Sequence, residues 1–66
     1  MGWTKHASYS INDREELSLW NTGISYDVRL DNHQNNTAYF LLESNDLSEA
    51  ERFYELIKAA YEELIY

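Results

Sequence analysis

The chain has 66 residues and no cysteine, so it forms one domain (1–66) with a thin core and has no disulfide, thiolate zinc site or thiol nucleophile. Its net charge of −7 disfavours direct contact with nucleic acid or membrane headgroups and favours basic protein surfaces. The sequence has no apolar run long enough to span a membrane and no N-terminal signal pattern, which predicts a soluble, cytoplasmic protein.

Residues 3–11 have the period of a strand with one wet face, because apolar and polar side chains alternate along them. The apolar members are Trp3, Ala7, Tyr9 and Ile11. Lys5 interrupts the apolar side near its start, which suits a strand at the edge of a sheet.

Residues 12–23 fit two structures. In a short helix Asn12 would be the N-cap, Glu15 would complete the first turn, and Gly23 would be a left-handed stop. In a strand Leu17 and Leu19 would share one face, followed by a tight turn. We favour the helix because two independent end signals agree on it, and we keep the strand as the alternative.

Residues 24–30 alternate cleanly and predict a strand, and 37–43 form a second β-rich run. The polar segment 31–36 between them contains residues that tolerate turn geometry, so the two runs read as a hairpin. In the second run Ala38, Phe40 and Leu42 are expected on one face, and Tyr39 and Leu41 on the other. Apolar residues on both faces indicate a central strand, or one whose outer face meets something.

Residues 46–66 predict one long helix that begins at a cap on Asp46 or Ser48. The residues expected to face the sheet are Phe53, Leu56, Ile57, Ala60 and Leu64. The predicted fold is therefore α+β: a small antiparallel sheet of three strands, or four if residues 12–22 are extended, with a long C-terminal helix packed on one face. A four-stranded meander with one helix is the second choice.

Nothing in the sequence predicts catalysis. His6 and His33 are the only histidines, and Asp31 beside His33 is the only local pairing, which a hydrogen-bonded loop explains. No spacing in the sequence pairs a serine with a residue that could act as its catalytic base. The sequence also has no glycine-rich loop that could bind phosphate. We therefore expect no enzyme activity, no catalytic residue, no cofactor and no metal.

The acidic side chains offer a binding surface. Glu51, Glu55, Lys58 and Glu62 form one stripe of the helix, for which a solvated face is the alternative explanation. Acids of the hairpin add to the stripe, and Tyr54, Tyr61 and Ile65 would line a flank that supplies aromatic anchors. The residues predicted to bind a partner are Asp27, Asp31, Glu43, Asp46, Glu51, Tyr54, Glu55, Tyr61 and Glu62. Spaced carboxylates of this kind can occupy a Lys/Arg groove meant for DNA or RNA.

The layout from residue 25 to 62 resembles that of small acidic anti-CRISPR proteins encoded by phages. It comprises the strand 25–30, an Asn/Asp-rich turn, the strand Thr37-Ala38-Tyr39-Phe40-Leu41-Leu42-Glu43-Ser44 and the helical segment 51–58. Some of those proteins mimic DNA at the protospacer-adjacent-motif site of Cas9. The resemblance implies an inhibitor that binds a larger basic protein or ribonucleoprotein in the host cytosol, without direct nucleic-acid or membrane contact. The alternative function is a homodimeric structural or regulatory protein joined through the Tyr54, Tyr61 and Ile65 flank.

Overall fold

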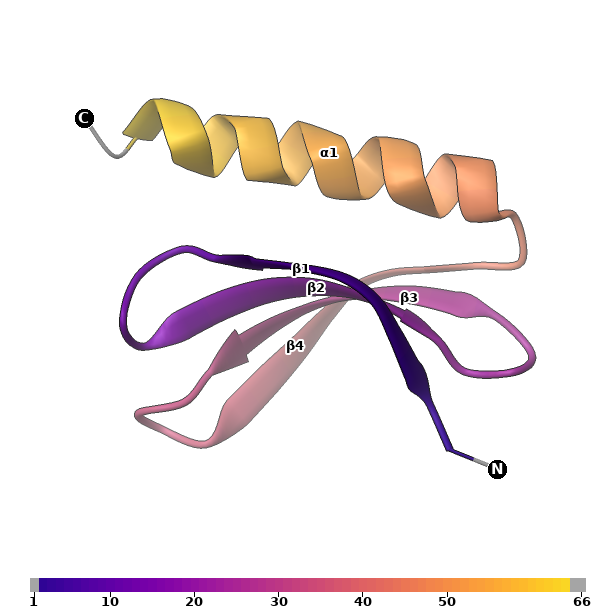
Figure 1. Cartoon of the computed structure of the whole chain (residues 1–66), viewed down its shortest axis with the longest axis horizontal. Coiled ribbons are helices and arrows are strands. Elements are labelled where there is room, and N and C mark those ends of the chain that lie inside the picture. The colour runs from indigo at the N-terminus through magenta and orange to yellow at the C-terminus, as the bar shows by residue number, and fades with distance from the viewer. Residues whose placement is uncertain (1, 65–66) are drawn as a thin grey trace.

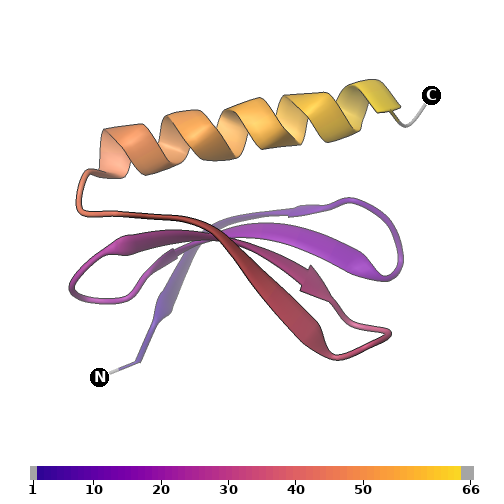
Figure 2. The ribbon, with the colours of Figure 1, turned by 180° about the vertical axis from the view of Figure 1, so that it is seen from behind.

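Four antiparallel strands and one helix make up residues 2–64, the part of the chain that the computed structural model describes, with side chains up to residue 63 (Figure 1). The elements are β1 (Thr4–Ser10), β2 (Glu15–Asn21), β3 (Tyr26–Asn32), β4 (Thr37–Ser44) and α1 (Leu47–Leu64). The strands lie in the order β1-β2-β3-β4, and α1 crosses one face of the sheet (Figure 2). This is the predicted α+β fold in its four-stranded form. Within the described chain no helix is long and apolar enough to cross a membrane.

The predicted short helix at 12–22 is wrong, although both of its end signals correspond to real local geometry. The Asn12 side-chain oxygen accepts hydrogen bonds from the backbone N–H of Arg14 (2.8 Å) and Glu15 (2.9 Å) and so closes the β1–β2 turn. Gly23 has a φ of 98° in the β2–β3 turn, which the Thr22 N–H closes by donating to Ser25 O (3.0 Å). Asparagine and glycine serve helix ends and tight turns alike, so these signals did not distinguish the two.

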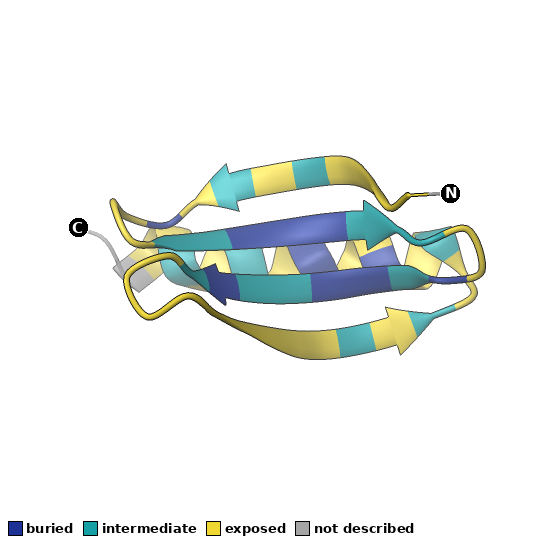
Figure 3. Ribbon diagram, turned by 90° about the horizontal axis from the view of Figure 1, so that it is seen from below, coloured by how far each residue is buried: buried dark blue, intermediate teal, exposed yellow. Residues whose placement is uncertain are grey.

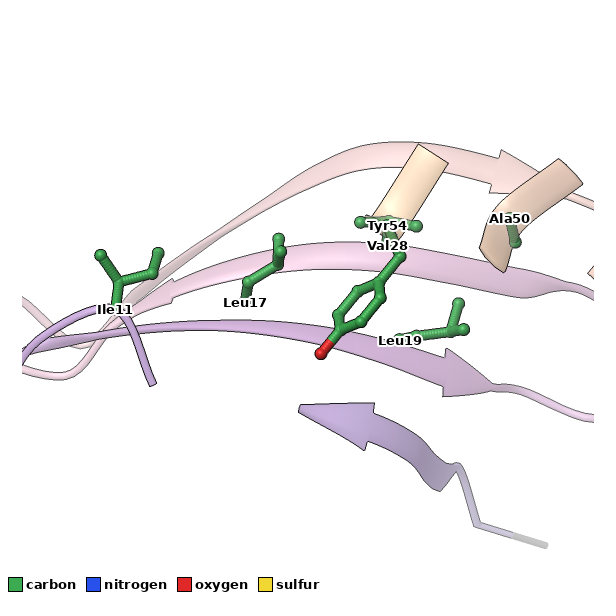
Figure 4. Packing of buried hydrophobic residues seen from close by; sticks show 6 residues of the cluster. All are labelled: Ile11, Leu17, Leu19, Val28, Ala50 and Tyr54. Carbon is green, nitrogen blue, oxygen red and sulfur yellow. The ribbon is translucent and has the colours of Figure 1, made fainter. Parts of the chain in front are cut away.

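Tertiary pairing decides that residues 15–21 are a strand. β2 pairs with β1 on one side and with β3 on the other. Leu17 and Leu19 point toward the helix and are fully buried, at 0% and 1% exposed. A helix would have put these two side chains on different faces, because they are only two residues apart. The strand buries both beneath α1, beside Val28 of β3 (Figure 4).

The stripe through which the helix packs matches the predicted one only in part. The side chains of α1 that pack in or against the core recur at spacings of three and four, and they include the predicted Phe53 and Ile57 together with Leu47, Ala50, Tyr54 and Tyr61. Tyr54 is 3% exposed, whereas Leu56, expected in the core, is 64% exposed. The helix is thus rotated by about a quarter turn from the expected phase. This rotation buries the Tyr54 ring and lets small Ala50 approach the sheet. The predicted contact of the Leu64 side chain lies outside the described residues.

Asp46, one of the two predicted caps, is the N-cap of α1. Its carboxylate accepts a hydrogen bond from the Ser48 N–H (2.9 Å), and its carbonyl accepts one from the Ala50 N–H (3.1 Å). Ser44 completes the cap by accepting from the Asp46 N–H (3.0 Å) and donating to the Glu49 carboxylate. The Ser48 hydroxyl is not the cap.

β4 is an edge strand, and an irregularity changes the alternation expected for it. Val28 pairs with Leu42, but its neighbour Arg29 pairs with Phe40, so Leu41 is an extra residue in the ladder. Leu42 therefore lies on the helix side with Val28, while Phe40 lies on the helix-free side with Arg29. The expectation that Phe40 and Leu42 share a face is wrong. The alternative expectation, that other residues contact the outer face of this strand, is confirmed, because Phe40 contacts Trp3 there.

Candidate protein-binding surfaces

The acidic flank of α1, defined as Glu51, Glu55 and Glu62, overhangs β1. All three side chains are exposed. Glu51 Oε2 lies 3.3 Å from His6 Nε2 of β1. Lys58, on the same stripe, places its Nζ atom 5.7 Å from the centre of the Tyr9 ring, also in β1. The flank is therefore a solvated row of carboxylates with one interspersed lysine.

The acids of the hairpin lie on the opposite side of the sheet from the helix. Asp27 and Asp31 are 6% and 7% exposed on β3, where they alternate with the helix-facing Val28. Asp31 receives two hydrogen bonds from the Arg29 guanidinium, Nε to Oδ1 (2.9 Å) and Nη2 to Oδ2 (3.2 Å). The Ser25 hydroxyl bonds Asp27 (3.2 Å) and approaches Glu43 (3.3 Å).

The expectation of one continuous acidic side is therefore wrong. The predicted partner-binding acids divide between the helix-free sheet face (Asp27, Asp31 and Glu43), the helix cap (Asp46) and the acidic flank. The physical reason is strand alternation: positions beside the inward-facing Val28 must point away from the helix. The acidic flank, Glu43 and Asp46 are exposed, and of these Asp46 is already engaged as the helix cap.

The predicted tyrosine flank does not exist as an exposed surface. Tyr54 is buried in the core and cannot anchor a partner of the folded chain, and Ile65 lies outside the described residues. Burial raises the pKa of the Tyr54 phenol above its ordinary value of 10.0, and the nearby Glu55 and Glu16 charges add to this effect. Tyr61 is half-buried.

Tyr61 contributes to a groove between α1 and the β4 edge, which we call the β4 groove. Its lining residues are Leu30, Leu41, Ile57, Ala60 and Tyr61, and its volume is about 350 Å³. None of the described residues that line it is charged. The sequence analysis missed this groove because the expected helix phase had placed Ala60 against the sheet, whereas Ala60 is exposed.

A second feature that the sequence analysis missed is the aromatic cluster of Trp3, Trp20 and Phe40 on the helix-free face (Figure 3 views this face). The Trp3 ring centre lies 6.1 Å from that of Trp20 and 6.0 Å from that of Phe40. The Arg29 guanidinium lies 5.1 Å from the Trp20 ring centre and 5.8 Å from that of Phe40, both in cation–π range. Apolar residues on both faces of 37–43 were the signal that could have revealed this cluster.

Glu16, on the same face, forms an ion pair with Lys5. Lys5 Nζ donates to its carboxylate at 2.9 Å, and His33 Nε2 lies 3.3 Å away. The hydrogen bond from Lys5 lowers the pKa of Glu16 below its ordinary value of 4.5; burial opposes this shift, and the Lys5 charge and His33 add to it. Because the folded-state pKa is depressed, the resulting stability is present above pH 4.5 and is lost as the pH falls through the lowered pKa.

Replacing Lys5 with methionine is therefore expected to return the Glu16 pKa toward 4.5 and to reduce the loss of stability in acid. NMR titration of the Glu16 side chain, with urea unfolding at several pH values, measures both quantities. Lys58→Met is the matched control, because Lys58 stacks on Tyr9 and has no contact with Glu16. A Glu16 pKa that shifts equally in both variants would contradict the assigned hydrogen bond.

Polar groups of the hairpin bond to one another or to the adjacent strand β2. Asp31 pairs with Arg29, His33 approaches Glu16, and the Asn32 side chain accepts from the Gln34 N–H (3.0 Å). The described residues contain no group of three or more His, Cys, Asp or Glu side chains that could hold a metal ion.

No family model, curated protein or solved structure matches this chain.

Proposed function

We propose that this protein acts by stoichiometric binding to the basic surface of a larger protein or ribonucleoprotein, through the acidic flank of α1. The observation that supports the proposal is the exposure of Glu51, Glu55 and Glu62 along one rigid helix. At about 1.5 Å of rise per residue, these carboxylates span about 16 Å. A row of fixed negative charges on that scale complements a groove lined by lysine and arginine and steers association toward it.

The layout and acidity that resemble phage anti-CRISPR proteins suggest the class of partner. We propose a nucleic-acid-guided nuclease, whose DNA-binding groove the acidic flank would occupy as a substitute for phosphates. The protein would then be a phage or mobile-element inhibitor that acts in the host cytosol. Asp27 and Asp31 are excluded from this role because they are buried and bonded to Ser25 and Arg29.

A matched pair of charge reversals tests which acids bind. Glu55→Lys and Glu43→Lys change the net charge equally at exposed positions, one on the acidic flank and one on the sheet. Against a Cas9–guide RNA complex as the probe, calorimetry should give a Kd at least about tenfold weaker for Glu55→Lys and little change for Glu43→Lys. Binding of the unmodified protein should weaken as salt rises, because the contact is electrostatic.

Three outcomes would count against the proposal. Loss of binding in Glu43→Lys alone would transfer the site to the sheet. Equal weakening in both variants would indicate a response to net charge and not to a defined surface. Absence of binding to the guide-loaded nuclease, with no protection of its target DNA from cleavage, would reject this class of partner.

A further inference from the structure

The molecule is a thin slab with two broad sides. Its Cα extents are 35 × 24 × 15 Å, and the shortest runs from β1 to β4, the viewing direction of Figure 1. One broad side is formed by β1 beneath the acidic flank. The other is formed by β4 and the β4 groove, and it faces the viewer in Figure 2.

The β4 side is open and apolar. β4 ends the sheet, so the backbone N–H and C=O groups along its outer edge have no neighbouring strand within the described chain. Tyr39 is 61% exposed and Leu41 38% exposed on this strand, and Leu56 of α1 is 64% exposed. Leu56 is four residues from Ala60, so it extends the apolar surface of the β4 groove along the helix.

Charge separates the two broad sides. Glu43 is the only residue of β4 with a charged side chain, and none of the described residues that line the β4 groove is charged. The Glu49 carboxylate, which accepts a hydrogen bond from Ser44, adds a charge at the end of the strand. The acidic flank lies at β1, the opposite edge of the sheet, where Lys5 adds a further charge. Copies of a chain with a net charge of −7 repel one another except where contact brings uncharged surfaces together. Residues 37–42 of β4 and the described lining of the β4 groove form the surface that meets this condition.

We propose that the β4 side binds a second copy of this chain, with the two β4 strands antiparallel and the two β4 grooves closed against each other. A two-fold contact brings the same surface from both copies together, and antiparallel edge pairing satisfies this symmetry. It directs the two acidic flanks to the outer ends of the dimer. The 35 × 24 Å outline of this side is large enough for the roughly 800 Å² that each partner buries in a standard interface.

The dimer uses the β4 side, whereas the proposed function uses the acidic flank, so either proposal can be rejected without rejecting the other. Sedimentation equilibrium of the purified chain should give twice the 7.9 kDa monomer mass, with a Kd of about 1 to 100 μM that higher salt does not weaken. Leu41→Glu places a carboxylate on the strand edge, and Ala60→Glu places one in the groove from the helix. Each is expected to weaken dimerisation at least about tenfold.

Ile24→Glu is the matched control, since Ile24 is 86% exposed in the β2–β3 turn and the charge change is the same. Far-ultraviolet circular dichroism checks that each variant folds. If Leu41→Glu does not fold, Ala60→Glu still tests the interface. A wild-type chain that stays monomeric to about 1 mM would overturn the proposal. So would a dimer that salt dissociates, or one that Ile24→Glu weakens as much as Leu41→Glu.

Discussion

Replacing Tyr54 with alanine is expected to lower the free energy of unfolding by about 3 to 5 kcal/mol, the usual cost of removing a buried aromatic ring. Tyr54 is 3% exposed and packs from α1 onto the central strands, near Leu19 and Val28 (Figure 4). A small domain has a total stability of about 5 to 15 kcal/mol, so the variant should lie close to its unfolding threshold.

Leu56→Ala is the matched control because it truncates a large side chain two residues away on the same helix. Leu56 is 64% exposed, and its loss should change the stability by less than about 0.5 kcal/mol. Urea unfolding, followed by circular dichroism, measures both variants. If Leu56→Ala cost as much as Tyr54→Ala, the helix would pack in the phase expected from sequence and the assigned core would be wrong.

Replacing Arg29 with methionine is expected to cost about 2 to 4 kcal/mol. The substitution keeps an apolar stem between the Trp20 and Phe40 rings but leaves the Asp31 carboxylate without its two hydrogen bonds. Breaking a buried ion pair by removing one partner leaves an uncompensated charge, which is the main source of the cost. The value falls below that of a fully buried pair because the Arg29 side chain keeps 24% of its surface exposed.

A double-mutant cycle identifies the pair as the cause. Asp31→Asn in the Arg29→Met background removes the carboxylate charge that has lost its partner, so it should recover part of the lost stability. The effects of the two substitutions should therefore not be additive. Arg52→Met is the control, since Arg52 is exposed on α1, and it should stay within about 0.5 kcal/mol of the wild type. Additive losses at Arg29 and Asp31 would show that the ion pair does not stabilise the sheet.

The misplaced helix shows how far amphipathic spacing can determine a packing face. Residues 46–66 offered two overlapping apolar stripes, one through Leu56 and Ala60 and one through Ala50 and Tyr54. Helical periodicity predicts each stripe equally well. The shape of the sheet beneath α1 selects between them, because Ala50 permits a close approach and the Tyr54 ring fills the space beside Val28 and Leu19.

The candidate site was only partly predictable for the same reason. The exposure of Glu51, Glu55 and Glu62 followed from their spacing on one helix, and it was predicted. Alternation also predicted that Asp27 and Asp31 share one face of the sheet, but it did not predict which face α1 would cover. The β4 groove and the aromatic cluster each join residues that lie far apart in the sequence, so no local pattern indicated them.

Local chemistry in the sequence was enough to specify the α+β class, the hairpin 24–43 and the long C-terminal helix, and it narrowed the helix cap to Asp46 or Ser48. Each depends on side-chain periodicity or on hydrogen bonds between near neighbours. Only the tertiary structure decided the state of residues 15–21, the phase of α1 and the division of the acids between two sides. Those outcomes depend on which surfaces bury together, since pairing with β1 and β3 stabilises β2 more than the turn residues Asn12 and Gly23 can stabilise a helix.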